Sequence, residues 1–121
     1  MANVIVVDDD VSVRSVVARM VHRDGHAVRE APDGMQAVKL MRSEAAELVI
    51  SDVYMPEMDG IEVLARLQHE FPAVRVIIMT GGGHLATGNL LDIASTLGAR
   101  ATLAKPIAEA ELRAAIARVL A

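Results

Sequence analysis

Short apolar runs alternate with longer amphipathic stretches along this chain, and this alternation limits its fold more than any other feature. Five runs rich in aliphatic residues have the length and flanks of strands. They cover residues 4–7, 27–31, 48–52, 74–79 and 101–104. Between and after them, apolar residues recur at spacings of three and four, which is typical of helices that bury one face. Strands and helices in strict alternation indicate a parallel sheet with right-handed crossovers.

We therefore predict a doubly wound α/β domain, with a five-stranded parallel sheet and five helices on its two faces. Of the two common strand orders, 2-1-3-4-5 suits a five-stranded chain of this length. This order puts the topological switch between the first and third strands, where ligands bind beyond the carboxyl ends. At 121 residues, a single domain over residues 1–121 is expected.

The helical stripes give specific expectations about burial. In the first helix, we expect the buried stripe to contain Val13, Val16, Val17, Met20 and Val21. In the second helix, the inward residues are expected to be Ala37, Val38, Met41 and Ala45. Asp59 and Glu62 form a plausible capping pair for the third helix. A short fourth helix is expected near residues 89–97, closed by a glycine at position 98.

Composition excludes several classes of function. The net charge is −4, and a nucleic-acid binder needs a basic face, so no nucleic-acid partner is expected. Tyr54 and Phe71 are the only aromatic residues, too few for a base-stacking surface. Apolar runs fall far short of the about 20 residues that span a bilayer, and the first residues do not resemble a signal peptide. Together with the absence of cysteine, this predicts a cytoplasmic protein without membrane contact.

Polar residues that could take part in binding or catalysis stand at the ends of four of the predicted strands. Asp8 and Asp9 end the first strand and Asp52 ends the third, while Thr80 and Lys105 end the fourth and fifth. In a parallel sheet, these ends share one edge. Crowded carboxylates need a raised pKa or a cation, and oxygen ligands without thiolate or imidazole favour Mg²⁺.

These residues suggest phosphoryl chemistry. Asp52 could act as a nucleophile that forms an aspartyl phosphate. Lys105 could pair with carboxylate or phosphoryl oxygens, and the Thr80 hydroxyl could donate to a phosphoryl oxygen. Each residue alone has a simpler interpretation, since an isolated strand-end aspartate can cap the next turn. Asp10, the third acid of its run, is interpreted as a helix cap or a solvated group.

The complete chain resembles the receiver (CheY-like) domain of bacterial two-component response regulators. The resemblance rests on an ordered set: the acidic pair 8–9, Asp52 with the motif Met-Pro-Glu-Met-Asp-Gly over 55–60, Thr80, and Lys105 followed by Pro106. It implies a flavodoxin-like fold and an Asp52 that accepts phosphate from a histidine kinase. It also implies a Mg²⁺ site made by Asp8, Asp9, Asp52 and the backbone carbonyl of Tyr54. The bond before Pro106 is expected to be cis.

This sequence departs from the family pattern at three places. Thr102 stands where the family has a switch aromatic, and Ile107 stands where phenylalanine is common. The loop 81–88 is rich in glycine and looks longer than in chemotaxis-type regulators. We therefore expect this loop to read out phosphorylation in place of the usual aromatic coupling, because glycine removes side-chain constraints. Unchanged hydrogen exchange in the loop on phosphorylation would contradict this expectation.

The favoured function is a phosphorylation-switched signalling module rather than a turnover enzyme. Expected partners are a sensor histidine kinase or a histidine phosphotransfer protein and a downstream protein, with the chain a monomer or weak dimer. A phosphorelay intermediate and a receiver cut from a larger hybrid kinase are open alternatives. A phosphatase of the haloacid dehalogenase type is disfavoured because Tyr54 stands where such enzymes place a second aspartate. A degenerate scaffold is disfavoured because all the phosphorylation residues are present.

Overall fold

The computed structural model contains a parallel sheet between two layers of helices, and it describes residues 1–53, 60–81 and 98–121. The elements are β1 (Asn3–Val7), α1 (Val11–Arg23), β2 (Ala27–Ala31), α2 (Gly34–Ser43), β3 (Leu48–Asp52), α3 (Gly60–Glu70), β4 (Arg75–Thr80), β5 (Ala101–Ala104) and α5 (Glu109–Leu120). All neighbouring strands pair in parallel, in the order β2-β1-β3-β4-β5. The predicted sheet and its strand order are therefore confirmed.

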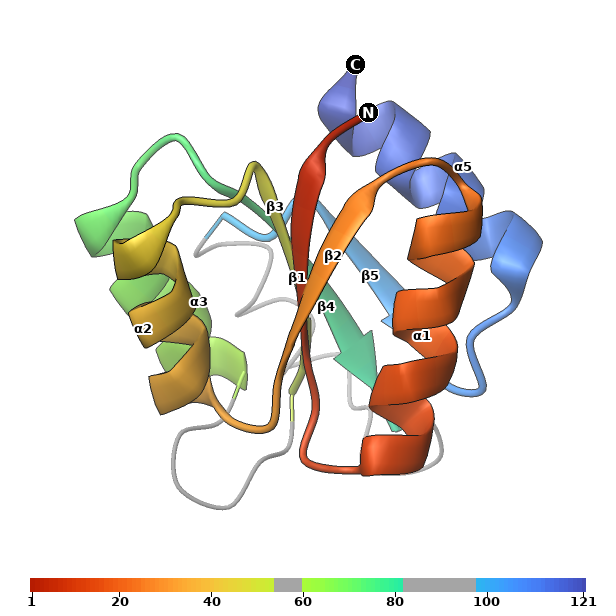
Figure 1. Ribbon diagram of the computed structural model, residues 1–121, viewed down its shortest axis with the longest axis horizontal. Helices are drawn as coiled ribbons and strands as arrows, with labels where there is room; N and C mark the ends of the chain where they lie inside the picture. The colour runs from red at the N-terminus through yellow and green to blue at the C-terminus, as the bar shows by residue number, and fades with distance from the viewer. Residues whose placement is uncertain (54–59, 82–97) are drawn as a thin grey trace.

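The two faces of the sheet carry separate apolar cores. In Figure 1, α1 and α5 cover one face, and α2 and α3 lie against the other. Alternation along the strands divides the side chains between these layers. Val4 and Val6 of β1 pack with the α1 and α5 layer, whereas Ile5 and Val7 pack with the α2 and α3 layer. Because the central strands are buried on both faces, they read as continuous apolar runs.

Short polar residues determine where the first two helices begin. The Asp10 carboxylate accepts hydrogen bonds from the backbone N–H groups of Ser12 and Val13, at 2.9 and 3.3 Å. Asp33 caps α2 in the same way by accepting from the N–H of Gln36 at 2.8 Å. Such caps satisfy N–H groups that have no partner inside the helix. The interpretation of Asp10 as a helix cap is confirmed.

Two expectations about buried residues are wrong. Val16 lies on α1 as expected, but it is 47% exposed, because the stripe is wider than the contact that α1 makes with the sheet. Ala45 lies beyond the end of α2 and is exposed, and Ala46 is buried in its place. The apolar spacing of the sequence continues past Ser43, but the helix ends at that residue.

Other expectations depend on segments outside the described residues. The predicted fourth helix at 89–97 and the capping residue Asp59 both lie in such segments. The same holds for the glycine-rich loop beyond Gly81. The bond between Lys105 and Pro106 is cis, as expected. In the described part of the chain, each helix is too short or too polar to cross a membrane.

Truncation of a core residue should destabilise the fold far more than truncation of an exposed one. Leu112 is fully buried between α5 and the sheet, whereas Val11 is 59% exposed. Leu112→Ala should lower the free energy of unfolding by about 2–5 kcal/mol, because it removes buried methyl groups and leaves a cavity. Val11→Ala should change it by less than about 0.5 kcal/mol. Urea unfolding followed by circular dichroism measures both, and equal effects would contradict this assignment of the core.

Candidate functional site

Strand register brings the predicted site residues to one edge of the sheet. Val7 of β1 pairs with Ser51 of β3, so the next residue of each strand, Asp8 and Asp52, emerges at the same level. Asp52 pairs in turn with Met79 of β4, the residue before Thr80. The acids at the ends of β1 and β3 therefore meet because these strands are neighbours.

Lys105 joins the two buried carboxylates. Its Nζ atom lies 2.8 Å from Asp8 Oδ2 and 3.2 Å from Asp52 Oδ1. Asp8 is fully buried and Asp52 is 5% exposed, so one cation serves two anions that water barely reaches. Burial alone would lower the pKa of Lys105. The hydrogen bond to Asp8 and the charges of Asp52 and Asp8 outweigh this effect and raise the pKa above its ordinary value.

Asp8 is held at almost every polar atom. Its Oδ1 accepts the backbone N–H of Asp10 at 3.0 Å, and its own N–H donates to the carbonyl of Ala31 at 3.2 Å. A buried carboxylate is tolerated only when it is paired and hydrogen-bonded, and these contacts meet that condition. Asp9, the next residue, is exposed. The site therefore has a fixed inner acid and a solvent-facing outer acid.

Asp8, Asp9 and Asp52 form a group that fits a hard divalent cation. One carboxylate oxygen of each residue lies within 4.8 Å of the others. Carboxylate charges about 5 Å apart repel by roughly 3 kcal/mol at an effective dielectric constant of about 20. Lys105 supplies one positive charge against three negative charges, which leaves a net charge of −2 to be compensated. An exposed oxygen at Asp9 suits Mg²⁺, which keeps several waters when it binds to protein carboxylates.

The structure brings Asp8, Asp9, Asp52 and Lys105 together. Thr80 ends β4 at the same edge of the sheet and is buried, at 3% exposed. The Thr80 carbonyl accepts the N–H of Lys105 at 2.8 Å and so fixes the start of the lysine segment. The predicted Tyr54 carbonyl ligand lies outside the described residues.

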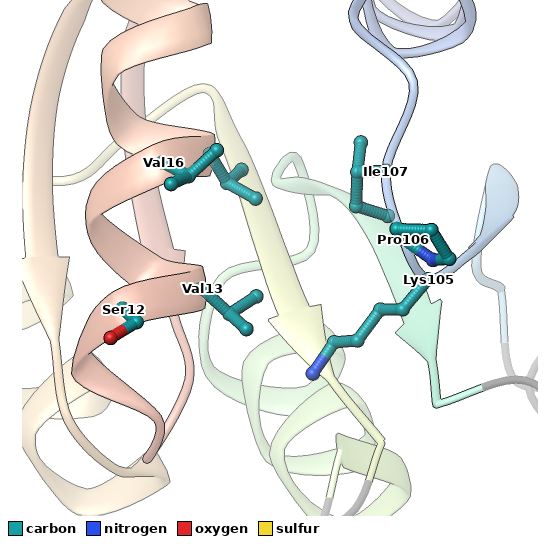
Figure 2. A pocket seen from close by; sticks show the side chains of 7 residues that line it. Ser12, Val13, Val16, Lys105, Pro106 and Ile107 are labelled. Atoms are coloured by element: carbon teal, nitrogen blue, oxygen red, sulfur yellow. The ribbon is translucent and has the colours of Figure 1, made fainter.

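Sequence reasoning missed two features around the site. Arg14 belongs to none of the motifs that the sequence offers, yet its Nη1 donates to the carbonyl of Asp8 at 3.0 Å. A small hollow of about 250 Å³ also opens beside Lys105, lined mainly by apolar side chains from α1 and from the segment after β5. In Figure 2, Val13 and Val16 face Pro106 and Ile107 across this hollow. The sequence does not indicate this hollow, because the exposure of Val16 that opens it depends on how α1 packs.

The raised pKa of Lys105 predicts a stability difference that depends on alkaline pH. A lysine in the unfolded chain has a pKa of about 10.4, so the contribution of Lys105 is complete below that pH. It is lost as pH rises through the higher pKa of the folded state. The difference in unfolding free energy between the native chain and Lys105→Met should therefore shrink above about pH 10.5. Urea unfolding at several pH values measures it, with exposed Lys39→Met as the control. A difference that stays constant across this pH range would contradict the ion-pair assignment.

Comparison with known proteins agrees with this geometry. The family model described as "Response regulator receiver domain" matches residues 4–117. Sporulation initiation phosphotransferase F of Bacillus subtilis is 33% identical over 117 residues, which cover 97% of this chain and 92% of that protein. Transcriptional regulatory protein ZraR of Escherichia coli is 34% identical over 119 residues. These residues cover 98% of this chain but only 26% of ZraR, so the chain spans about a quarter of that regulator.

Solved structures show the same fold. The chemotaxis protein CheY4 of Vibrio cholerae superposes with a TM-score of 0.90 at 27% sequence identity, and the match covers 98% of each chain. The family match covers the acidic pair, the Asp52 strand and the lysine that joins them. The chain therefore belongs to the response regulator receiver domains of two-component systems, whose general function is phosphorylation on an aspartate.

Proposed function

We propose that Asp52 is the phosphoacceptor and that the phosphoryl group comes from a phosphohistidine on a histidine kinase or histidine phosphotransfer protein. The observation that carries this proposal is the Lys105 bridge to Asp8 and Asp52, with Asp9 close by. Such an arrangement pairs the Asp52 carboxylate with a cation in a nearly dry setting, where the carboxylate can act as a nucleophile. In the family to which the chain belongs, aspartate phosphorylation is the general activity.

The transfer requires little covalent chemistry from the protein. An Asp52 carboxylate oxygen attacks phosphorus, the phosphorus–nitrogen bond to the donor histidine breaks, and the departing imidazole takes its electron pair and a proton from solvent. Lys105 is placed to move from the Asp52 carboxylate to a phosphoryl oxygen, since its flexible stem carries a point charge. Mg²⁺ bound by Asp8, Asp9 and Asp52 would neutralise charge on the cluster and on the phosphoryl oxygens.

The hollow beside Lys105 supports a protein donor. We define the donor face as Val13, Val16, Pro106 and Ile107, which line this hollow together with Lys105. Its volume of about 250 Å³ is below the range typical of small-molecule sites, but it can receive side chains from a docked protein. A phosphohistidine-bearing helical surface placed there would bring its imidazole to the edge where Asp52 lies. The donor face thus gives a role to Val16, an apolar residue of α1 that is 47% exposed.

A switch fits these residues better than a turnover enzyme. The second residue after Asp52 is Tyr54, which cannot serve as the carboxylate acid and base of an aspartate-based phosphatase. Phosphorylation would add negative charge at an edge already rich in carboxylates and would bias nearby segments between two states. A downstream protein would read that change. We also propose a cytoplasmic location and a monomer or weak dimer, in keeping with the acidic, cysteine-free composition.

A phosphorelay intermediate is the second candidate. One relative carries the name phosphotransferase, and the present chain covers 92% of it. In a relay, Asp52 would pass its phosphoryl group to another histidine, by the reverse of the transfer above. Loss of phosphate from the labelled chain on addition of a purified histidine phosphotransfer domain, faster than spontaneous hydrolysis, would support this role.

Intact mass after incubation with acetyl phosphate tests the central proposal. The native chain should gain one phosphoryl group in the presence of Mg²⁺ and almost none with a chelator, because the acidic cluster needs a cation. Asp52→Asn should gain none, and Asp10→Asn should still be labelled because Asp10 only caps a helix. Labelling of Asp52→Asn at the native rate would disprove the role of Asp52.

A charge placed on the donor face should slow phosphoryl transfer from a protein donor but not from a small-molecule donor. Val16→Glu should slow transfer from a phosphorylated histidine phosphotransfer domain by at least about tenfold, because a carboxylate would be buried in an apolar contact. Labelling by acetyl phosphate should stay within about twofold of the native rate. Met35→Glu adds the same charge at an exposed position of α2 and serves as the control. An equal loss with both phosphoryl donors would contradict a docking role for this face.

A further inference from the structure

Arg14, in the first turns of α1, connects three parts of the fold beside the acidic cluster. Its Nη1 donates to the backbone carbonyl of Asp8 at 3.0 Å, and its Nε donates to Glu30 Oε1 of β2 at 3.1 Å. The Arg14 side chain is only 16% exposed, so the guanidinium lies within the structure rather than in solvent. The fork geometry of arginine allows both bonds at once. The loop after β1 is thereby tied to a neighbouring strand.

The bond to Asp8 acts on the position of Asp9. The carbonyl of Asp8 belongs to the peptide that joins Asp8 to Asp9, and a peptide is planar, so a fixed carbonyl fixes the direction in which the chain enters Asp9. Asp8 itself is already held by Lys105, by the N–H of Asp10 and by the carbonyl of Ala31. Asp9 is exposed, so packing does little to orient it. The Arg14 contact is thus a restraint that selectively concerns the outer acid of the cluster.

The charge of Arg14 and its position have opposite effects on a bound cation. A guanidinium next to a Mg²⁺ site repels the ion, so removal of its charge alone would tighten binding. A restraint that prepares Asp9 for binding strengthens it, because less order must be created when the ion arrives. When Arg14 is removed, a gain in Mg²⁺ affinity therefore indicates that its charge dominates, and a loss indicates that its restraint on Asp9 dominates.

We propose that Arg14, anchored by Glu30, is a positioning residue that prepares Asp9 to bind Mg²⁺. This inference rests on the proposed function, since the Mg²⁺ site belongs to it. The restraint acts through the backbone of the β1–α1 connection and leaves the phosphoacceptor untouched. Arg14 should therefore affect the affinity for Mg²⁺ and have little effect on the phosphorylation rate once Mg²⁺ saturates the site.

Calorimetric titration of the full chain with Mg²⁺ tests the proposal. Arg14→Gln removes the charge and the hydrogen bonds to Asp8 and Glu30, and it should raise the Mg²⁺ dissociation constant by about tenfold, as expected when groups that orient metal ligands are lost. Labelling by acetyl phosphate at saturating Mg²⁺ should stay within about twofold of the native rate. Arg19→Gln makes the same charge change at an exposed position of the same helix and should leave the dissociation constant unchanged.

Two milder variants keep the test decisive if Arg14→Gln does not fold. Arg14→Lys can keep one of the two bonds and should restore part of the affinity. Glu30→Ala leaves the guanidinium in place but removes its anchor, and it should weaken Mg²⁺ binding by a smaller factor than Arg14→Gln. The midpoint of thermal unfolding without Mg²⁺ shows whether a variant has lost overall stability. A weaker affinity in variants whose thermal midpoints match that of Arg19→Gln supports a positioning role.

The same titration separates failure of this inference from failure of the proposed function. If the native chain binds Mg²⁺, Asp9→Asn loses it, and the Arg14 variants bind as tightly as the native chain or more tightly, the positioning role is overturned and the metal site stands. If the native chain does not bind Mg²⁺ at all, both the metal site and the role of Arg14 are overturned.

Discussion

The single ammonium group of Lys105 between Asp8 and Asp52 is the contact on which the site depends. It pairs at once with two carboxylates that are almost fully buried, and a buried charge is tolerated only with such a partner. The pair of bonds also joins the end of β1 to the end of β3 and both to the segment after β5. The same interaction therefore compensates the charge of the carboxylates and links the strand ends at this edge of the sheet.

The sheet makes this contact possible because its strand order is not the order of the sequence. β1 lies between β2 and β3, so residues 8 and 52 become neighbours, and β5 returns to the far side of β4 with Lys105 at its end. The two apolar layers keep these strands rigid. A rigid frame lets a few polar groups hold fixed distances, whereas the exposed Asp9 needs an additional restraint such as the Arg14 contact.

Much of the fold could be predicted from the sequence, because five aliphatic runs and their helical intervals allow few parallel arrangements. The strand order and the meeting of Asp8, Asp52 and Lys105 followed from that pattern. Expectations failed where periodicity was used as a measure of burial. Val16 has the helical spacing of a core residue but lies on a part of α1 that the sheet does not cover, and Ala45 lies beyond the end of its helix.

The sequence by itself determined the kind of chemistry, since three strand-end acids, a lysine and no cysteine leave little other than oxygen-ligand and phosphoryl chemistry. Tertiary structure alone decided how these groups are divided. It made Asp8 a buried structural anchor and Asp9 an exposed acid, and it brought Arg14 onto the Asp8 carbonyl. The physical reason is that burial and hydrogen-bond partners depend on which elements pack together, and local spacing carries no information about distant neighbours.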